Sequence, residues 1–234
     1  MKRGCLPLNG DCLLHAVIDE KIEVMMDFNT ETWRGYHEAE YLPGLTGTSF
    51  KHMVQYYELE AILFKGMNVL EIGVGLGRCA QGFYEYGCNM FALDICEEAF
   101  HKIRNYIVAS YLHKNVEKLP EGFVDLAVSH LVTQHMSESD ILNQFPAVIR
   151  SLKSSGSFRV QFAGSTIAEE NNIKETIVGM PADNKVSMLG GRMVRTSNYA
   201  VELVKKCGGK VIHTSSLRHF PKYKSYWYWL EVIK

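Results

Sequence analysis

Residues 68–78 read Asn68-Val-Leu-Glu-Ile-Gly-Val-Gly-Leu-Gly-Arg78, and this stretch decides the fold of the chain. Its first half has the apolar composition of a buried strand, and the residues from Arg78 to Tyr86 predict a helix. Glycines between the two let the backbone adopt positive φ and approach a ligand closely. The N-terminus of the helix presents free N–H groups and a positive dipole end. The stretch therefore predicts a strand, turn and helix that favour a ligand carboxylate.

Strands and helices alternate outward from this unit. We expect strands at 90–95, 123–131, 157–162, 210–214 and 225–233, and helices at 49–64, 97–111, 140–152 and 198–207. This alternation predicts an α/β fold, with a mostly parallel sheet and helices on both faces. The strand at 225–233 directly follows another strand, so we expect it to run antiparallel. One more strand of the series is expected between Tyr111 and Leu119, short or irregular, near Val116.

The chain is expected to form one domain with two additions. Its 234 residues suit a single α/β domain with a full core. Residues 1–48 mix aromatic and acidic side chains and predict a lid or substrate-contacting segment before a domain at 49–234. Residues 164–196 lack periodicity, and a connection of this length is usually functional, so we predict a cap inserted over the site.

Composition and charge narrow the class of protein. A formal net charge of -1 gives no general field that would attract nucleic acid. No apolar run approaches the roughly 20 residues that span a bilayer, and residues 1–10 lack a secretory signal. The six cysteines form no C-x-x-C pair, and no carboxylate/His cluster has metal-ligand spacing. We expect a cytoplasmic protein with free thiols and no metal, nucleic-acid or membrane partner. Its oligomeric state stays open.

A second signal, Asp94, ends the next strand in Phe91-Ala-Leu-Asp-Ile95. A carboxylate there can accept hydrogen bonds from both hydroxyls of an adenosine ribose. It can instead cap the helix that starts at Glu97. Dinucleotide-binding folds prefer G-x-G-x-x-G followed by an acid about 20 residues later. The G-x-G-x-G spacing here, with Glu71 before it, departs from that pattern. A nicotinamide-dependent oxidoreductase remains an alternative.

The pattern Glu71-x-Gly73-x-Gly75-x-Gly77, followed by Asp94, resembles the class I S-adenosylmethionine (SAM)-dependent methyltransferases. Two later stretches extend the resemblance in the same order. Residues 115–130 are similar to the adenine loop and fourth strand of that family, and residues 148–158 to its turn into the fifth strand. The resemblance implies a seven-stranded sheet with a reversed last strand. It also implies SAM as the cofactor and S-adenosylhomocysteine as its product.

The resemblance further implies which residues contact the cofactor. It places the glycines around the methionine part of SAM, Asp94 at the ribose, and Asn115 beside the adenine, although an acid is usual at that last position. The implied cofactor-binding residues are Glu71, Gly73, Gly75, Gly77, Asp94, Ile95, Asn115, Val116 and Ser129. Trp33 and Tyr36 are predicted to cover the sulfonium by cation–π attraction, or alternatively to pack in a satellite core.

His130 and His135 are the candidate catalytic residues, and both follow the fourth strand. A neutral imidazole with a pKa of about 6.5 suits the removal of a hydroxyl proton at neutral pH. Either histidine can instead be structural. The candidate substrate-binding residues are His37, Gln161, Arg192 and Arg195. The arginines suit a phosphate or carboxylate, with a surface role as the alternative.

The leading hypothesis is methyl transfer to a small molecule, with a hydroxyl of a sugar or glycan precursor as the first acceptor. N-methylation of a sugar amine or another small metabolite is the alternative. The fourth strand ends in Ser129-His-Leu-Val132, not in the Asn/Asp-Pro-Pro-aromatic turn that methyltransferases acting on base amines share. A protein or RNA methyltransferase and a non-catalytic subunit of the same fold also remain open. A protein or RNA methyltransferase would need an open, charged groove, and the sequence shows no sign of one. A non-catalytic subunit need not keep the glycines at 73, 75 and 77, which this sequence has.

Overall fold

The computed structural model describes residues 49–178, 192–220 and 225–234. The helices are α2 (Phe50–Tyr56), α3 (Arg78–Tyr86), α4 (Glu97–Ile103), α5 (Glu138–Ser151), α6 (Thr166–Glu170) and α7 (Ser197–Lys206), with 3-10 turns η1 (His113–Lys118) and η2 (Thr133–His135). The strands are β1 (Asn68–Ile72), β2 (Asn89–Asp94), β3 (Ala109–Leu112), β4 (Val124–Ser129), β5 (Leu152–Gly164), β6 (Glu175–Val178), β7 (Arg192–Arg195), β8 (Lys210–Thr214), β9 (Arg218–Phe220) and β10 (Ser225–Ile233). The predicted lid at 1–48, with Trp33, Tyr36 and His37, lies outside the described residues.

All described strands belong to one sheet, whose main path is β3-β2-β1-β4-β5-β10-β8. The five strands from β3 to β5 pair in parallel. β10 runs antiparallel to both of its neighbours, β5 and β8. This arrangement confirms the expected seven-stranded, mostly parallel sheet with a reversed last strand. β6, β7 and β9 attach beside this path and were not predicted.

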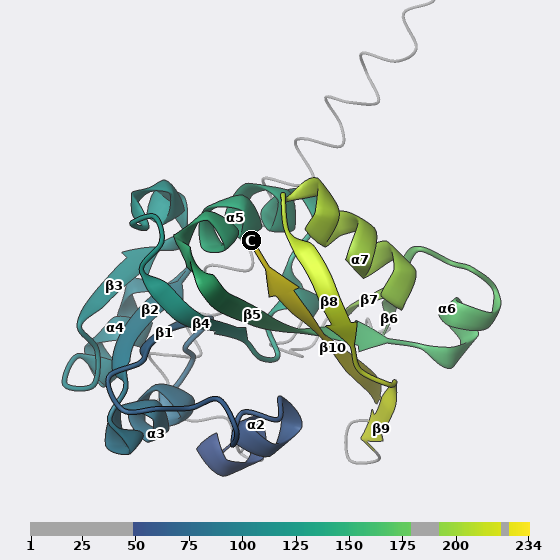
Figure 1. Ribbon diagram of the computed structural model, residues 1–234. Helices are drawn as coiled ribbons and strands as arrows, with labels where there is room; N and C mark the ends of the chain where they lie inside the picture. The colour runs from purple at the N-terminus through teal and green to yellow at the C-terminus, as the bar shows by residue number, and fades with distance from the viewer. Residues whose placement is uncertain (1–48, 179–191, 221–224) are drawn as a thin grey trace, which may run out of the picture.

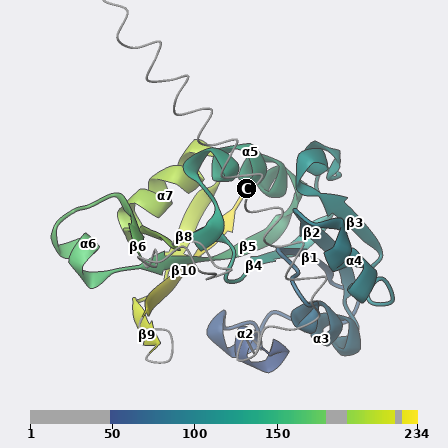
Figure 2. The ribbon, with the colours of Figure 1, turned by 180° about the vertical axis from the view of Figure 1, so that it is seen from behind.

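Helices cover both faces of the sheet, as Figures 1 and 2 show from opposite sides. Successive side chains of a strand point to opposite faces. Leu70 and Ile72 of β1 therefore pack in the core beneath α5 and α7. Val69 packs in the second core, with residues of α2, α3 and α4. The result is a three-layer α/β domain in which the central parallel strands β1 and β4 are buried on both sides.

Helix α2 is shorter than predicted. It begins after Ser49, whose side-chain oxygen accepts a hydrogen bond from the N–H of His52, and it ends at Tyr56. Glu58 has a positive φ of 57°, which no helix accommodates. The chain therefore turns there, and the apolar residues up to Leu63 pack as a compact loop. The predicted helix to residue 64 was wrong because an apolar run alone does not reveal such a turn.

The expected third strand lies before the predicted place. β3 (Ala109–Leu112) pairs with β2, with Tyr111 opposite Leu93, and α4 ends at Ile103 instead of continuing to Tyr111. Pairing along the edge of the sheet thus outweighs the helical pattern of these residues. Val116, near which the strand was expected, lies in η1 and is buried in the core.

Helix α5 and strand β5 follow each other without a loop. Ser137 caps α5 in a reciprocal pair of hydrogen bonds with Asp140, and β5 starts directly at Leu152. Gly156 lies inside β5, not in a loop beyond the helix as expected. A side chain at Gly156 would collide with the backbone oxygen of Val124 in β4. The glycine is required there by a close approach of two backbones.

The described ends of the predicted cap at 164–196 contain secondary structure. α6 follows β5, and β6 pairs antiparallel with β7, which in turn pairs with β5. These elements widen the sheet beyond β5. The covering role predicted for this segment stays a prediction.

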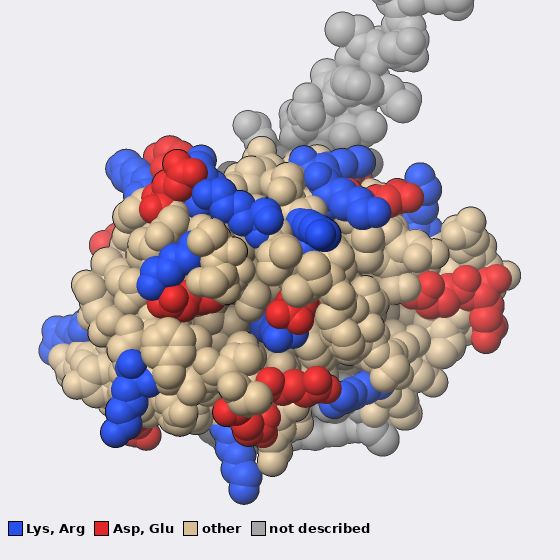
Figure 3. Space-filling model, viewed as in Figure 1, with Lys and Arg blue, Asp and Glu red and all other residues tan. Residues whose placement is uncertain are grey.

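The surface view in Figure 3 shows Lys and Arg interspersed with Asp and Glu over the face that carries α5 and β8. No helix within 49–178, 192–220 or 225–234 is long and apolar enough to cross a bilayer. In the same part of the chain, no three His, Cys, Asp or Glu side chains are grouped so that they could bind a metal ion.

Candidate functional site

The turn between β1 and α3 contains three glycines with positive φ, and two of them are confined by neighbours. Gly73 donates its N–H to the carbonyl of Leu93 at 2.7 Å, and a side chain there would collide with Val132. A side chain at Gly77 would collide with Ile103 of α4. These two glycines let the turn pack closely against β2, against Val132 in the loop after β4, and against α4.

Gly75 differs from both of them. Its φ is 53°, and apart from its own chain neighbours no atom of the described residues lies within 4 Å of the place where a Cβ would stand. The turn is therefore packed closely on either side of a backbone position that faces open space. Such an exposed backbone next to a helix N-terminus is suited to contact a ligand.

Asp94 ends β2 beside this turn, as the sequence predicted. Its Oδ1 accepts a hydrogen bond from the N–H of Cys96 at 3.0 Å, and Oδ2 accepts one from the N–H of Gly75 at 3.4 Å. Burial raises the pKa of the carboxyl to about 6, and the backbone N–H groups oppose that rise. Cys96 is itself the N-cap residue of α4, so Asp94 bonds to the backbone in front of that helix and does not fill the capping role considered for it. Ile95, half-buried, follows directly.

Glu71 is a buried carboxyl on β1, two residues before the turn. Its Oε2 has no hydrogen-bond partner among the described residues. Burial, together with the nearby charge of Asp94, raises the pKa of Glu71 to about 8. A buried carboxylate without a partner is costly, so this group requires either a proton or a cationic ligand.

Strand β4 ends at Ser129, next to His130. Ser129 is fully buried, and its Oγ also lacks a partner within the described ranges. Its carbonyl oxygen accepts a hydrogen bond from the hydroxyl of Tyr57 at 2.8 Å. His130 Nδ1 lies 3.2 Å from the same hydroxyl oxygen. Because Tyr57 donates its one proton to Ser129, Nδ1 of His130 must be the donor in this second bond.

The pKa of His130 differs from the value of an ordinary histidine that the sequence suggested. Burial lowers it to about 3, with a further contribution from repulsion by His52. The rings of Tyr56 and Tyr57 stand edge-on to the imidazole, each with a centroid distance of 5.5 Å. His130 is therefore neutral throughout the physiological range of pH.

Comparison with known proteins agrees with the geometry of the glycine turn and Asp94. Residues 69–156 match the family model described as a methyltransferase domain. Within these residues the chain carries a methyltransferase domain, and its fold is the class I, Rossmann-like one. No curated protein sequence matches it significantly.

Solved structures show how widely this methyltransferase fold recurs. One is a 1,6-didemethyltoxoflavin N1-methyltransferase of Burkholderia thailandensis, solved with 1,6-didemethyltoxoflavin and S-adenosylhomocysteine (TM-score 0.63, 16% identity, 99% of this chain and 93% of that one). Another is the glycopeptide N-methyltransferase MtfA with sinefungin (0.59, 17%, 82% and 89%). A third is a SAM-dependent methyltransferase of Leishmania major (0.65, 14%, 89% and 82%). At these identities the likeness establishes the fold.

The methyltransferase holds His130 in place by a strained turn. Leu131, directly after it, has a positive φ of 61°. A branched residue in this conformation is costly and persists only where its surroundings impose it. The N–H of Leu131 donates to Oε1 of Gln161 at 2.8 Å, and Gln161 is buried on β5. Gln161, predicted to line the substrate pocket, thus also fixes the backbone that carries His130.

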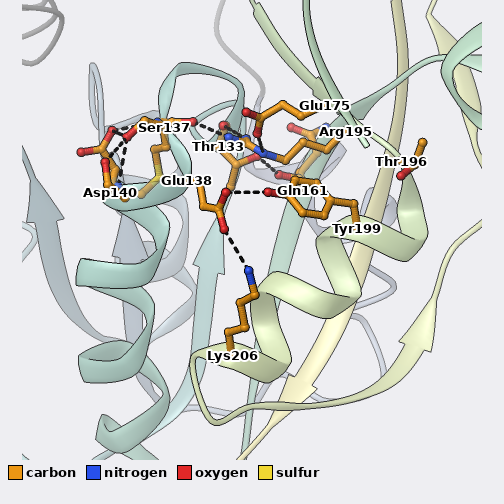
Figure 4. A network of polar contacts seen from close by, with 12 residues as sticks. Thr133, Ser137, Glu138, Asp140, Gln161, Glu175, Arg195, Thr196, Tyr199 and Lys206 are labelled. Carbon is orange, nitrogen blue, oxygen red and sulfur yellow. Dashed lines mark hydrogen bonds and ion pairs between the residues drawn. The ribbon is translucent and has the colours of Figure 1, made fainter. Parts of the chain in front are cut away.

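Arg195 fastens the next part of the same loop (Figure 4). Its Nη1 donates to the carbonyl of Thr133 at 2.9 Å and its Nη2 to that of Met136 at 2.8 Å. Nε forms an ion pair with Glu175 of β6. The side chain is fully buried, which favours a structural role over the predicted contact with substrate. The side chain of Arg192 lies outside the described ones.

The remaining predicted site residues lie at the same edge of the sheet. His135 is half-buried in η2, where its Nε2 lies 2.8 Å from Nε2 of Gln134. Asn115 and Val116 lie in η1, directly after β3 at the C-terminal ends of the strands. Val116 is buried among core residues, and Asn115 is half-buried.

Sequence reasoning missed the role of Tyr57. The chain separates it from His130 by 73 residues, so no local pattern links the two. Two adjacent tyrosines at the end of a short helix, Tyr56 and Tyr57, were the available signal, and they were interpreted only as part of an apolar face.

Proposed function

We propose that this methyltransferase uses SAM to methylate a small-molecule acceptor held beside His130. The observation that carries the proposal is the glycine turn, in which Gly75 lies between two closely packed glycines, and before which Oε2 of the buried Glu71 has no partner among the described residues. SAM supplies a methyl group activated by a sulfonium, with a thioether as the leaving group.

The residues present fit this cofactor. Glu71 suits its ammonium group, because a cation there compensates the buried charge. The N-terminus of α3, which no side chain caps, suits its carboxylate. Asp94 suits the ribose hydroxyls, since a carboxylate at the end of β2 can accept their hydrogen bonds beside those from backbone N–H groups.

A nitrogen acceptor agrees best with the state of His130. An alcohol attacks poorly unless a base removes its proton, and the strength of that base matters. An imidazole with a pKa of about 3 is a weak base. A neutral amine or heterocyclic nitrogen needs no prior loss of a proton. His130 then accepts a hydrogen bond from the acceptor's N–H, and the proton leaves after the methyl carbon has bonded to nitrogen.

A hydroxyl of a sugar or glycan precursor is the second candidate acceptor. In its favour, His130 is unprotonated at neutral pH and can accept a hydrogen bond from the hydroxyl. Two of the solved methyltransferases of this fold are named as N-methyltransferases acting on a heterocycle and on a glycopeptide. Nitrogen-containing heterocycles and amino sugars are therefore the first compounds to test, followed by their hydroxyl analogues.

Calorimetric titration with SAM, S-adenosylhomocysteine and NADH tests the cofactor. We expect saturable binding of the first two and none of NADH. Transfer of a labelled methyl group to matched amine and hydroxyl acceptors then tests the substrate class. Binding of NADH alone would refute the proposal. Preferred labelling of hydroxyl compounds would overturn the choice of nitrogen.

A further inference from the structure

We propose that Tyr57 is a positioning residue that fixes both the tautomer and the ring orientation of His130. This inference rests on the proposed function, because it takes His130 to be the group that meets the acceptor. Tyr57 belongs to the segment directly after α2, whereas His130 follows β4, so the contact joins the helical layer to the edge of the sheet.

The direction of the hydrogen bonds follows from counting donors. Tyr57 has a single hydroxyl proton, and the carbonyl oxygen of Ser129 can only accept. The bond of 2.8 Å therefore uses the tyrosine proton. The hydroxyl oxygen then accepts from Nδ1 of His130 at 3.2 Å. In the neutral imidazole this leaves the lone pair on Nε2.

Tyr57 is itself held rigidly. Its side chain is fully buried, and its ring packs edge-on against Trp229 at a centroid distance of 5.9 Å and against Tyr56 at 4.9 Å. Burial also raises the pKa of its hydroxyl well above the usual value, which favours the protonated, hydrogen-donating form. A fixed donor produces a fixed tautomer.

The bond to Tyr57 determines which ring nitrogen of His130 can accept a hydrogen bond from the methyl acceptor. Without the hydroxyl of Tyr57, the hydrogen bond that holds the proton on Nδ1 is lost, and the preference of His130 for this tautomer falls. With it, Nε2 is always the accepting atom. Correct orientation of a reacting group raises the reaction rate by large factors, because even a small misplacement slows the reaction.

Nitrogen NMR of the protein with labelled histidines identifies the tautomer of His130 and requires no enzymatic turnover. We expect His130 to carry its proton on Nδ1 in the wild type and to show a mixture of tautomers in Tyr57→Phe. Tyr228→Phe is the matched control. It also removes a buried hydroxyl bonded to backbone carbonyls, those of Arg195 and Thr196, and should leave His130 unchanged.

Kinetics supply the second test. Tyr57→Phe should lower kcat by about 10- to 100-fold while SAM affinity stays unchanged. In a His130→Ala background the same substitution should lower kcat no further, because Tyr57 acts through His130. Tyr228→Phe should retain the wild-type kcat.

Two results would overturn the inference: a wild-type His130 protonated on Nε2, or losses in kcat that multiply in the double variant. The first needs only the wild-type protein, so it decides the matter even if Tyr57→Phe does not fold. Absence of SAM binding by the wild type would instead refute the proposed function, whichever tautomer is found.

Discussion

At the scale of a single residue, the buried carboxyl of Glu71 opposes the stability of the folded protein. It is buried beside Asp94 without a hydrogen-bond partner for Oε2 in the described structure, and its pKa is raised to about 8. The folded protein therefore prefers the protonated acid, whereas the unfolded chain ionises near pH 4.5. The stability linked to this group is complete below about pH 4.5 and is lost as pH rises through about 8.

Glu71→Gln should remove this pH dependence. Each unit of pKa difference corresponds to about 1.4 kcal/mol, so the cofactor-free wild type should lose a few kcal/mol relative to the variant between about pH 5 and pH 9. Urea denaturation across this range measures the difference. The variant should also bind SAM more weakly. Parallel pH profiles of the two proteins would show that the Glu71 carboxyl is satisfied in solution.

The three glycines of the turn should respond differently to alanine. Gly75→Ala places a methyl group in open space, so it should cost only the roughly 1–2 kcal/mol of left-handed backbone strain while it blocks SAM. Gly73→Ala meets Val132 and should destabilise the fold as well. Thermal denaturation and calorimetry of both variants separate the effects. Full SAM affinity in Gly75→Ala would place the cofactor elsewhere.

Among the elements, the loop after β4 depends on distant partners for its shape. Arg195 of β7 binds the carbonyls of Thr133 and Met136, and Gln161 of β5 binds the N–H of Leu131. Both contacts are buried, and both hold backbone that carries no regular hydrogen-bond ladder. The position of His130 is thus determined by strands that lie later in the chain.

Arg195→Met should destabilise the protein by about 3–5 kcal/mol, because it leaves Glu175 and two carbonyls without their buried partner. The measurement is the free energy of unfolding in urea. Lys206→Met is the control, since it breaks an exposed ion pair with Glu138 and should cost about 1 kcal/mol or less. Equal losses in the two variants would argue against a tethering role for Arg195.

The elements also show what the sequence could predict. α3 and β10 match their predicted ranges, because glycines and a clear apolar pattern bound them. α2 and α4 end earlier than predicted, since Glu58 adopts positive φ and β3 pairs with β2. Spacing along the chain brought the glycines and Asp94 together, but contacts such as Tyr57 with His130 exist only in the folded state.

On the scale of the whole molecule, one long strand of the sheet comes from far along the chain. β10 lies between β5 and β8 and is antiparallel to each. β5 therefore gains its second long neighbour from residues 225–233, more than 60 positions after its own end at Gly164.

This placement of β10 has a consequence for biosynthesis. While the ribosome is still translating the segment between β5 and β10, the growing chain has a long apolar strand edge with no partner. Such an edge is prone to pair with other chains. The nascent polypeptide can assemble β1 to β5 early, but the sheet closes only after residue 233 has left the exit tunnel. A chaperone that shields the edge of β5 during this interval should increase the yield of native protein.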